Sequence, residues 1–262
     1  MEIVLNERSF HITPNHIYDT QFWNYFAERE YEPITQSFMY RELSSKTQFF
    51  DIGAAAGSYS LLALSLGSSV VAVEAVPDIF CAMRKNVEDN LKPEDEVELV
   101  SAAVAVESGV VTSDESLKHQ VLSPIVFTDI MSESPINQIK LIDLFGTYRD
   151  ERTMCLVKMD IEGSEYKLFS MRENVEMFSK ERILIYLSLH PGFMRPPMRL
   201  PFVLKFFQRI VRTLWNTVDL WKLHRSVSGK AVIWCNEVKV TSRLRFISLV
   251  LLRFYDFVLD FR

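Results

Sequence analysis

The 262-residue sequence predicts an α/β fold in which a mostly parallel sheet carries helices on both faces. Three observations support it. Short apolar runs of strand length alternate with stretches of helical periodicity along most of the chain. Two of these runs end at an acidic residue, and glycines or a proline lead from there into a helix. Near the C-terminus, two segments of alternating polarity predict an antiparallel hairpin. Five strands and this hairpin make a seven-stranded sheet.

Composition excludes several classes of protein. Nearly half of the residues are hydrophobic, which allows a large core and one domain of ordinary α/β size. The net charge of −5 gives no general attraction to nucleic acid, so we expect no nucleic-acid partner. Three isolated cysteines indicate a reducing compartment. Residues 1–10 contain charges and no long apolar run, unlike a signal peptide. We therefore expect a cytoplasmic protein.

The most informative stretch is FFDIGAAAGSYS, residues 49–60. Residues 47–52 are apolar and partly aromatic, as in a strand buried on both faces. Asp51 stands at the end of this strand, and Gly53 and Gly57 flank three alanines, so little obstructs a ligand lying across the turn. Ser58 is expected to cap the helix that follows. Such strand–turn–helix units bind nucleotides in open α/β sheets.

Charge predicts which nucleotide binds. The second strand, residues 69–73, is followed by Glu74, and two carboxylates at neighbouring strand ends would repel a diphosphate. They suit S-adenosylmethionine, with Asp51 on the side of its ammonium group and Glu74 accepting both ribose hydroxyls. The alternative is a plain strand pair with an acid in each loop. The complete predicted cofactor set is Asp51, Gly53, Ala54, Gly57, Ser58, Tyr59, Glu74, Ala75, Ala103 and Asp160.

The middle of the chain continues the alternation. We expect a helix over residues 78–91, a strand over 97–104 with a short extension at 110–111, and a helix over 136–145. The intervening residues 113–135 lack clear periodicity. A loop of this length is usually functional, so we expect it to cover the substrate.

A second acidic turn follows the fourth strand, residues 154–159. Asp160 ends the strand, and Glu162 and Glu165 follow around Gly163. Acidic residues are also favoured at helix N-termini by the helix dipole, which explains Glu165 without a site. Asp160 ends a buried strand, so a site role is favoured there, and for Glu162 both readings stay open.

A fifth strand, residues 182–189, leads directly to His190. A histidine at the carboxyl end of a strand is well placed for a general base, and its ordinary pKa suits proton abstraction near neutral pH. A packed histidine is an equal alternative. Two alternating strands, residues 217–224 and 230–238, then form the predicted hairpin.

The two ends of the chain differ from the centre. Residues 1–46 contain an aromatic cluster at helical spacing, which favours a helical cap over a lid that touches substrate. The apolar tail, 243–262, predicts a helix that is too short and too charged to span a bilayer. It must be covered by its own domain, by a second subunit in a homodimer, or by a membrane surface; the first two are favoured. The expected division is 1–46, 47–240 and 241–262.

These segments together resemble the FkbM-type methyltransferase family. Tyr31-Glu32-Pro33, FFDIGAAAGSYSLLAL, VVAVEAVPDIF with Asn86 and Asn90, and VELVSAAVAVESG are similar to successive family elements. LVKMDIEGSEYKLF resembles the family's distinctive Lys-x-Asp-x-Glu-Gly-x-Glu block. The similarity covers residues 31–238. It implies the class I methyltransferase fold, Rossmann-like, and an S-adenosylmethionine-dependent O-methyltransferase acting on a hydroxyl of a saccharide or secondary metabolite.

The chemistry follows from this assignment. Methyl transfer from a sulfonium is an in-line displacement, and a hydroxyl acceptor must lose its proton as the new bond forms. His190 or Asp160 is the expected base, with Glu162 as a further catalytic candidate. A divalent metal held by Asp160 and Glu162 is the weaker alternative, because no third hard ligand is identifiable near these two acids in the sequence, so no metal site is assigned. Ser188 stands where the family commonly has Glu. A non-catalytic cofactor-binding scaffold is therefore the alternative function.

Overall fold

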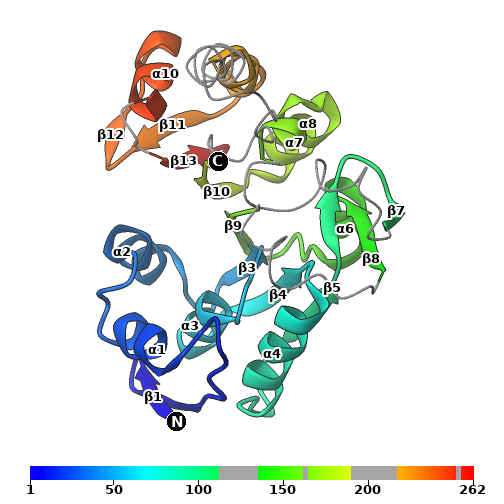
Figure 1. Cartoon of the computed structure of the whole chain (residues 1–262). Coiled ribbons are helices and arrows are strands. Elements are labelled where there is room, and N and C mark those ends of the chain that lie inside the picture. Colours follow the sequence, from blue (N-terminus) through cyan, green and yellow to red (C-terminus); the bar gives the residue numbers. More distant parts are fainter. Residues whose placement is uncertain (112–134, 162–164, 190–216, 252–254) are drawn as a thin grey trace, which may run out of the picture. The chain divides into compact units, whose positions relative to one another are not determined.

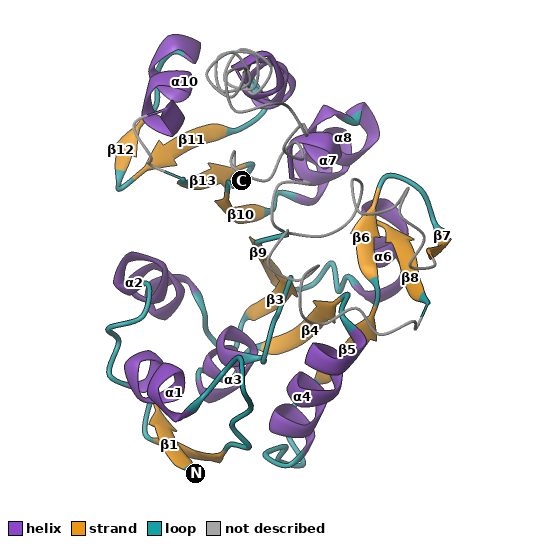
Figure 2. Cartoon of the chain, viewed as in Figure 1, coloured by secondary structure: helices purple, strands orange, loops and turns teal. Residues whose placement is uncertain are grey.

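The computed structural model describes residues 1–111, 135–161, 165–189, 217–251 and 255–262 (Figures 1 and 2). The chain divides into two compact units. Unit 1 consists of Met1–Val111 and Ser134–Met159, and unit 2 of Thr112–Glu133 and Asp160–Arg262. Each unit is described by itself.

The core of unit 1 is a parallel sheet with strand order β9-β3-β4-β5. Every residue of β3 is buried, as expected for a central parallel strand. The elements of unit 1 are, in order, β1 (Glu2–Leu5), β2 (Arg8–His11), α1 (Thr20–Ala27), α2 (Pro33–Glu42), β3 (Thr47–Ile52), α3 (Ser58–Ser65), β4 (Ser69–Glu74), α4 (Pro77–Glu88), β5 (Val97–Ser101), β6 (Ala103–Ala105), β7 (Gly109–Val111), β8 (Ile136–Lys140), α6 (Leu141–Tyr148) and β9 (Met154–Met159).

The alternation of β3 decides which helix each residue meets. Successive side chains of a strand point to opposite faces of the sheet. Phe50 stacks on Phe145 of α6, with ring centroids 4.3 Å apart. Asp51 faces the other way and accepts a hydrogen bond from Ser60 of α3. The two faces of β3 are therefore covered by different helices.

The N-terminal residues of unit 1 add a hairpin to the expected helices. β1 and β2 pair around Asn6 and Glu7, whose φ angles of 45° and 66° suit a two-residue hairpin turn. Asn90 of the loop after α4 holds this hairpin through both the amide and the carbonyl of His11, at 2.7 Å each. The sequence pattern did not reveal these two short strands.

Two predictions for the middle of the chain were wrong in detail. Residues 136–140 form β8 and the helix begins only at Leu141, because β8 pairs with β6 and β7 in a three-stranded sheet. The isoleucines at 136 and 139 have helical spacing, but strand pairing overrides it. The strand expected over 97–104 is interrupted at Ala102, which divides β5 from β6.

Unit 2 contains antiparallel strands in the order β10-β13-β11-β12. Residues 217–227 are helical, so the strand expected over 217–224 was wrong. The hairpin lies later in the chain than predicted: β11 and β12 form it and turn at Asn236 and Glu237, with φ of 47° and 64°. The named elements of unit 2 are α7 (Glu165–Ser170), α8 (Arg172–Glu181), β10 (Leu184–Ser188), β11 (Val232–Cys235), β12 (Val238–Lys239), α10 (Arg243–Leu251) and β13 (Asp256–Asp260).

The C-terminal tail is not a single helix. Helix α10 is followed by β13, which pairs with β10 on one side and β11 on the other. Phe257 and Leu259 are buried, whereas Asp256, Val258 and Asp260 are half-buried. This period of two is that of a strand, and the many apolar residues of the tail conceal it in the sequence. Part of the tail is thus covered by its own unit. Among the described residues, no helix is long and apolar enough to cross a membrane. The three-part division of the chain stays a prediction.

Candidate cofactor site

The turn after β3 is shaped by residues in the left-handed region. Gly53, Ala55 and Gly57 have φ of 81°, 53° and 86°. The amides of Gly53 and Ala54 both donate to the carbonyl of Val73 in β4, at 2.9 and 3.0 Å. This places the turn against the carboxyl end of the next strand.

Gly57, not Ser58, is the N-cap of α3, and no side chain caps this helix. A Cβ atom at Gly57 would lie 3.1 Å from Cγ of Met83 and 3.4 Å from Cγ2 of Val87, both in α4. Glycine is required here by helix packing as well as by its φ angle. The packing role of Gly57 against α4 adds to the ligand clearance predicted from the sequence.

Glu74, the last residue of β4, is held by the turn. Its Oε2 accepts a hydrogen bond from the amide of Ala55 at 3.0 Å, and its Oε1 from the amide of Val76 at 2.8 Å. The side chain is buried, and burial raises the pKa of its carboxyl to about 7, against the opposing effect of the backbone amides. Each carboxylate oxygen can accept a further hydrogen bond. Two neighbouring acceptors of this kind suit a vicinal diol.

Asp51 is buried, with 1% of its surface exposed, as expected for the end of a strand covered on both faces. Its Oδ2 accepts a hydrogen bond from the Ser60 hydroxyl at 2.7 Å, which ties the end of β3 to α3. The negative charge of Asp51 also raises the pKa of Glu74, so the two carboxylates lie close enough to interact.

The structure brings most of the predicted cofactor residues to one place. Residues 51–59 form the turn and Glu74 and Ala75 adjoin it. Ala103 opens β6, and the amide of its neighbour Ala102 donates to the carbonyl of Glu74 at 3.1 Å. Asp160 belongs to unit 2 and is half-buried. The catalytic candidates His190 and Glu162 lie outside the described residues.

Three residues that lie near the turn were not among the predicted site residues: Glu32, Ser60 and Lys158. Lys158 of β9 has only 4% of its surface exposed, and its Nζ lies 5.1 Å from the ring centroid of Tyr59. It is also the Cα partner of Asp51 across the β3–β9 pair. A lysine within a buried apolar strand was the available signal, because a buried ammonium needs nearby partners.

Asn86 supports the turn from behind. Its side chain donates to the carbonyl of Ala56 at 3.2 Å and accepts from the amide of Thr13 at 3.0 Å. In unit 2, Glu165 is fully buried and accepts from the amide of Ile161 at 3.0 Å, which fits the structural reading of that acid. Among the described residues, no group of three His, Cys, Asp or Glu side chains could hold a metal ion.

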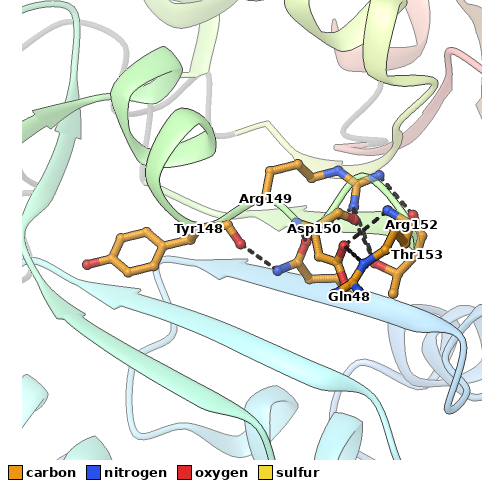
Figure 3. Close-up of polar contacts among 6 residues, drawn as sticks. All are labelled: Gln48, Tyr148, Arg149, Asp150, Arg152 and Thr153. Carbon is orange, nitrogen blue, oxygen red and sulfur yellow. Dashed lines mark hydrogen bonds and ion pairs between the residues drawn. The ribbon is translucent and has the colours of Figure 1, made fainter.

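A second polar cluster lies at the opposite, amino-terminal end of the unit 1 sheet (Figure 3). It borders a cavity of about 570 Å³ whose walls include Gln48, Arg149 and Arg152. Arg149 donates to the carbonyl of Thr153 at 2.8 Å, and Arg152 pairs with Asp150 at 2.9 Å. These cations are engaged by the loop itself, so this cluster serves to fasten the loop before β9 to the sheet.

The parallel sheet, the glycine turn and the acid at the end of β4, together with the antiparallel C-terminal strands, define an α/β class I methyltransferase-like fold. The family model described as Methyltransferase FkbM domain matches residues 51–214. The chain therefore belongs to the FkbM methyltransferase family and is an S-adenosylmethionine-dependent methyltransferase. The predicted family, the α/β class I methyltransferase fold class and the cofactor are confirmed. The predicted seven strands are wrong in number, because among the described residues unit 1 supplies the four parallel strands β9-β3-β4-β5 and unit 2 the four strands β10-β13-β11-β12.

Similarity to solved structures is distant. The S-adenosylhomocysteine-bound methyltransferase PaMTH1 of Podospora anserina shares 12% identity, with a TM-score of 0.39, over 97% of this chain and 90% of that one. A putative methyltransferase, yhhF, from Escherichia coli shares 13% identity, with a TM-score of 0.37, over 77% of this chain and 87% of its own. No curated protein matches the chain.

Proposed function

We propose that this protein transfers the methyl group of S-adenosylmethionine to a hydroxyl group of a saccharide or a hydroxylated secondary metabolite. The observation that carries the proposal is Glu74 at the end of β4. Its two oxygens are fixed by separate backbone amides, and each oxygen can accept one further hydrogen bond. This arrangement supports the predicted contact with the ribose diol of the cofactor.

Two further points favour a small hydroxyl acceptor. The net charge of −5 gives no electrostatic attraction to a polyanion such as RNA or DNA. The resemblance that includes Lys158-Met159-Asp160 implies hydroxyl methylation. We propose His190 or Asp160 as the base that removes the hydroxyl proton, with Glu162 as a further catalytic candidate.

The contacts of Ser188 weaken the argument for a non-catalytic scaffold, which was based on this residue alone. Its hydroxyl donates to Oδ1 of Asp256 in β13 at 2.7 Å, so the serine has a structural role between two strands of unit 2. Its departure from the usual family residue thus has an explanation that does not require loss of catalysis.

The test uses S-adenosylmethionine carrying a ¹³C-labelled methyl group and acceptor sets of oligosaccharides, hydroxylated metabolites, RNA and protein. The proposal expects label in the small hydroxyl acceptors, with the carbon chemical shift of a methyl ether. Label in an amine, a thiol or a nucleobase would overturn it. Cofactor binding without turnover on any acceptor set would favour the scaffold function. A His190→Ala, Asp160→Asn double variant with full turnover would exclude both proposed bases.

A further inference from the structure

Glu32 has an unusual backbone for its position. It is the N-cap residue of α2, yet its φ of 46° and ψ of 59° are left-handed, and its side chain makes no capping hydrogen bond. Acidic caps normally accept from the first helical amides, and non-glycine residues avoid this conformation. An outlier of this kind suggests that the side chain is held in place for another purpose.

The carboxylate of Glu32 is directed at the cofactor turn instead. Its Oε2 accepts a hydrogen bond from the hydroxyl of Tyr59 at 2.8 Å. Tyr59 stands two residues after Gly57, in the first turn of α3, and is buried. The Tyr59 ring lies edge-on to the ring of Phe26, with centroids 5.1 Å apart. The ammonium group of Lys158, a residue of β9, lies 5.1 Å from the centroid of the Tyr59 ring. Glu32 is thus fixed beside the carboxyl ends of β3 and β9.

The segment that presents Glu32 is itself anchored. Gln36 is buried and its amide donates to the carbonyls of Tyr31 and Phe26, at 2.8 and 3.1 Å. These bonds fix the backbone on the N-terminal side of Glu32, and the ring of Pro33 restricts it on the other side. The position of the carboxylate is therefore set before any ligand binds.

We propose that Glu32 binds the α-ammonium group of the methionine end of the cofactor, with Tyr59 as its positioning residue. Glu32 and Asp51 each accept one hydroxyl hydrogen bond, from Tyr59 and Ser60 respectively. They differ in exposure, because Asp51 is 1% exposed whereas Glu32 is partly exposed, so a ligand can reach the Glu32 carboxylate more readily. A pre-positioned carboxylate gives a charge-assisted bond to an ammonium group. The proposal rests on cofactor binding and replaces Asp51 with Glu32 as the direct partner of the ammonium.

The test compares two ligands that share the adenosine half. S-adenosylhomocysteine carries the amino acid end, and 5′-methylthioadenosine lacks it. For Glu32→Gln we expect the affinity for S-adenosylhomocysteine to fall about 10-fold or more, since one charge-assisted bond is lost. The affinity for methylthioadenosine should stay unchanged, both measured by titration calorimetry. Glu30→Gln, an exposed acid in the same segment, is the matched control and should change neither.

Tyr59→Phe separates the positioning role from a structural one. The variant keeps the buried ring and removes only the hydroxyl, so we expect a smaller loss for S-adenosylhomocysteine and none for methylthioadenosine. Equal losses for both ligands in either variant, or an unchanged S-adenosylhomocysteine affinity in Glu32→Gln, would overturn the proposal. These are binding measurements alone, so they stand whether or not the hydroxyl acceptor of the proposed function is found.

Discussion

The two ends of the parallel sheet in unit 1 both carry buried or half-buried polar groups, but the pKa of a carboxyl group is raised at one end and lowered at the other. At the carboxyl end, Glu74 is buried against backbone amides and its pKa is raised to about 7. At the amino end, Asp150 pairs with Arg152, and this hydrogen bond lowers the pKa of the aspartate. One end keeps acceptor capacity for a ligand. At the other end the charged side chains pair within the loop and with Gln48, and only Nε of Arg149 is buried without a hydrogen-bond partner among the described residues of this cluster.

This difference shows why polar residues at a strand end do not by themselves mark a site. The guanidinium of Arg149 donates to the Gln48 side chain and to the loop before β9, so Gln48 and the loop hold each other (Figure 3). At the other end, Glu74 is buried although burial disfavours its charged form and raises its pKa. A perturbed carboxyl at the mouth of a sheet is the stronger functional signal.

The largest effect on cofactor affinity is expected for Glu74→Gln. The neutral amide loses one acceptor and the negative charge, so the bonds to both ribose hydroxyls weaken. We expect S-adenosylhomocysteine affinity to fall about 100-fold, from the usual strength of hydrogen bonds to charged groups, as measured by calorimetry. Glu98→Gln, an exposed glutamate on β5 near the amino end, is the control. Equal affinity in the two variants would contradict the assignment of the carboxyl end as the site.

The shape of the turn provides the second test. Gly57→Ala introduces a methyl group 3.1 Å from Met83 at a φ of 86°, so we expect about 2 kcal/mol less stability in urea unfolding. Gly229→Ala isolates the φ contribution, because Gly229 has φ of 81° and no atom within 4 Å of its added Cβ. If the two variants lose the same stability, the packing role of Gly57 is wrong.

The sequence predicted the carboxyl end of the sheet better than the rest because its signals are local. A buried strand, an acid and two glycines within a few residues specify the turn and place Asp51 and Glu74 near it. The hydrogen bond between Glu32 and Tyr59 joins residues 27 positions apart. Periodicity in the sequence does not reveal such a contact, so the Tyr31-Glu32-Pro33 segment gives a family resemblance but no prediction of a site role for Glu32.

The errors elsewhere arise from strand partners far away in the chain. β13 was taken for part of a helix because the preceding residues 243–255 are mostly apolar, and only pairing with β10 and β11 selects the extended form. The helix at 217–227 alternates in polarity over a short stretch, which favoured a strand. Short apolar segments are decided by tertiary contacts, and their local pattern is ambiguous.

The pH dependence of Glu74 sharpens the contrast between the two ends. Its pKa is raised in the folded protein, so its contribution to the free energy of unfolding is fully present below pH 4.5 and is lost as the pH rises to about 7. Cofactor affinity should change the other way. It should fall up to about tenfold per pH unit below 7, because the ribose hydroxyls need the carboxylate.

The measurement is calorimetric titration of S-adenosylhomocysteine between pH 4.5 and 8, with urea unfolding over the same range. Glu74→Gln should remove both slopes between pH 4.5 and 7. A wild-type affinity that is flat over this window would mean that the carboxylate does not contact the ribose.

The smallest expected effects are at the amino end, and they concern stability alone. Arg149→Met removes the hydrogen bonds to the Gln48 side chain and the Thr153 carbonyl, so we expect a loss of about 1 to 2 kcal/mol in urea unfolding. Arg152 is 88% exposed and pairs with Asp150 two residues away, so Arg152→Ala should leave stability unchanged. Both variants should keep wild-type affinity for S-adenosylhomocysteine. A folded Arg149→Met protein with impaired cofactor binding would show that the two ends of the sheet are coupled, because no ligand contact would have been removed.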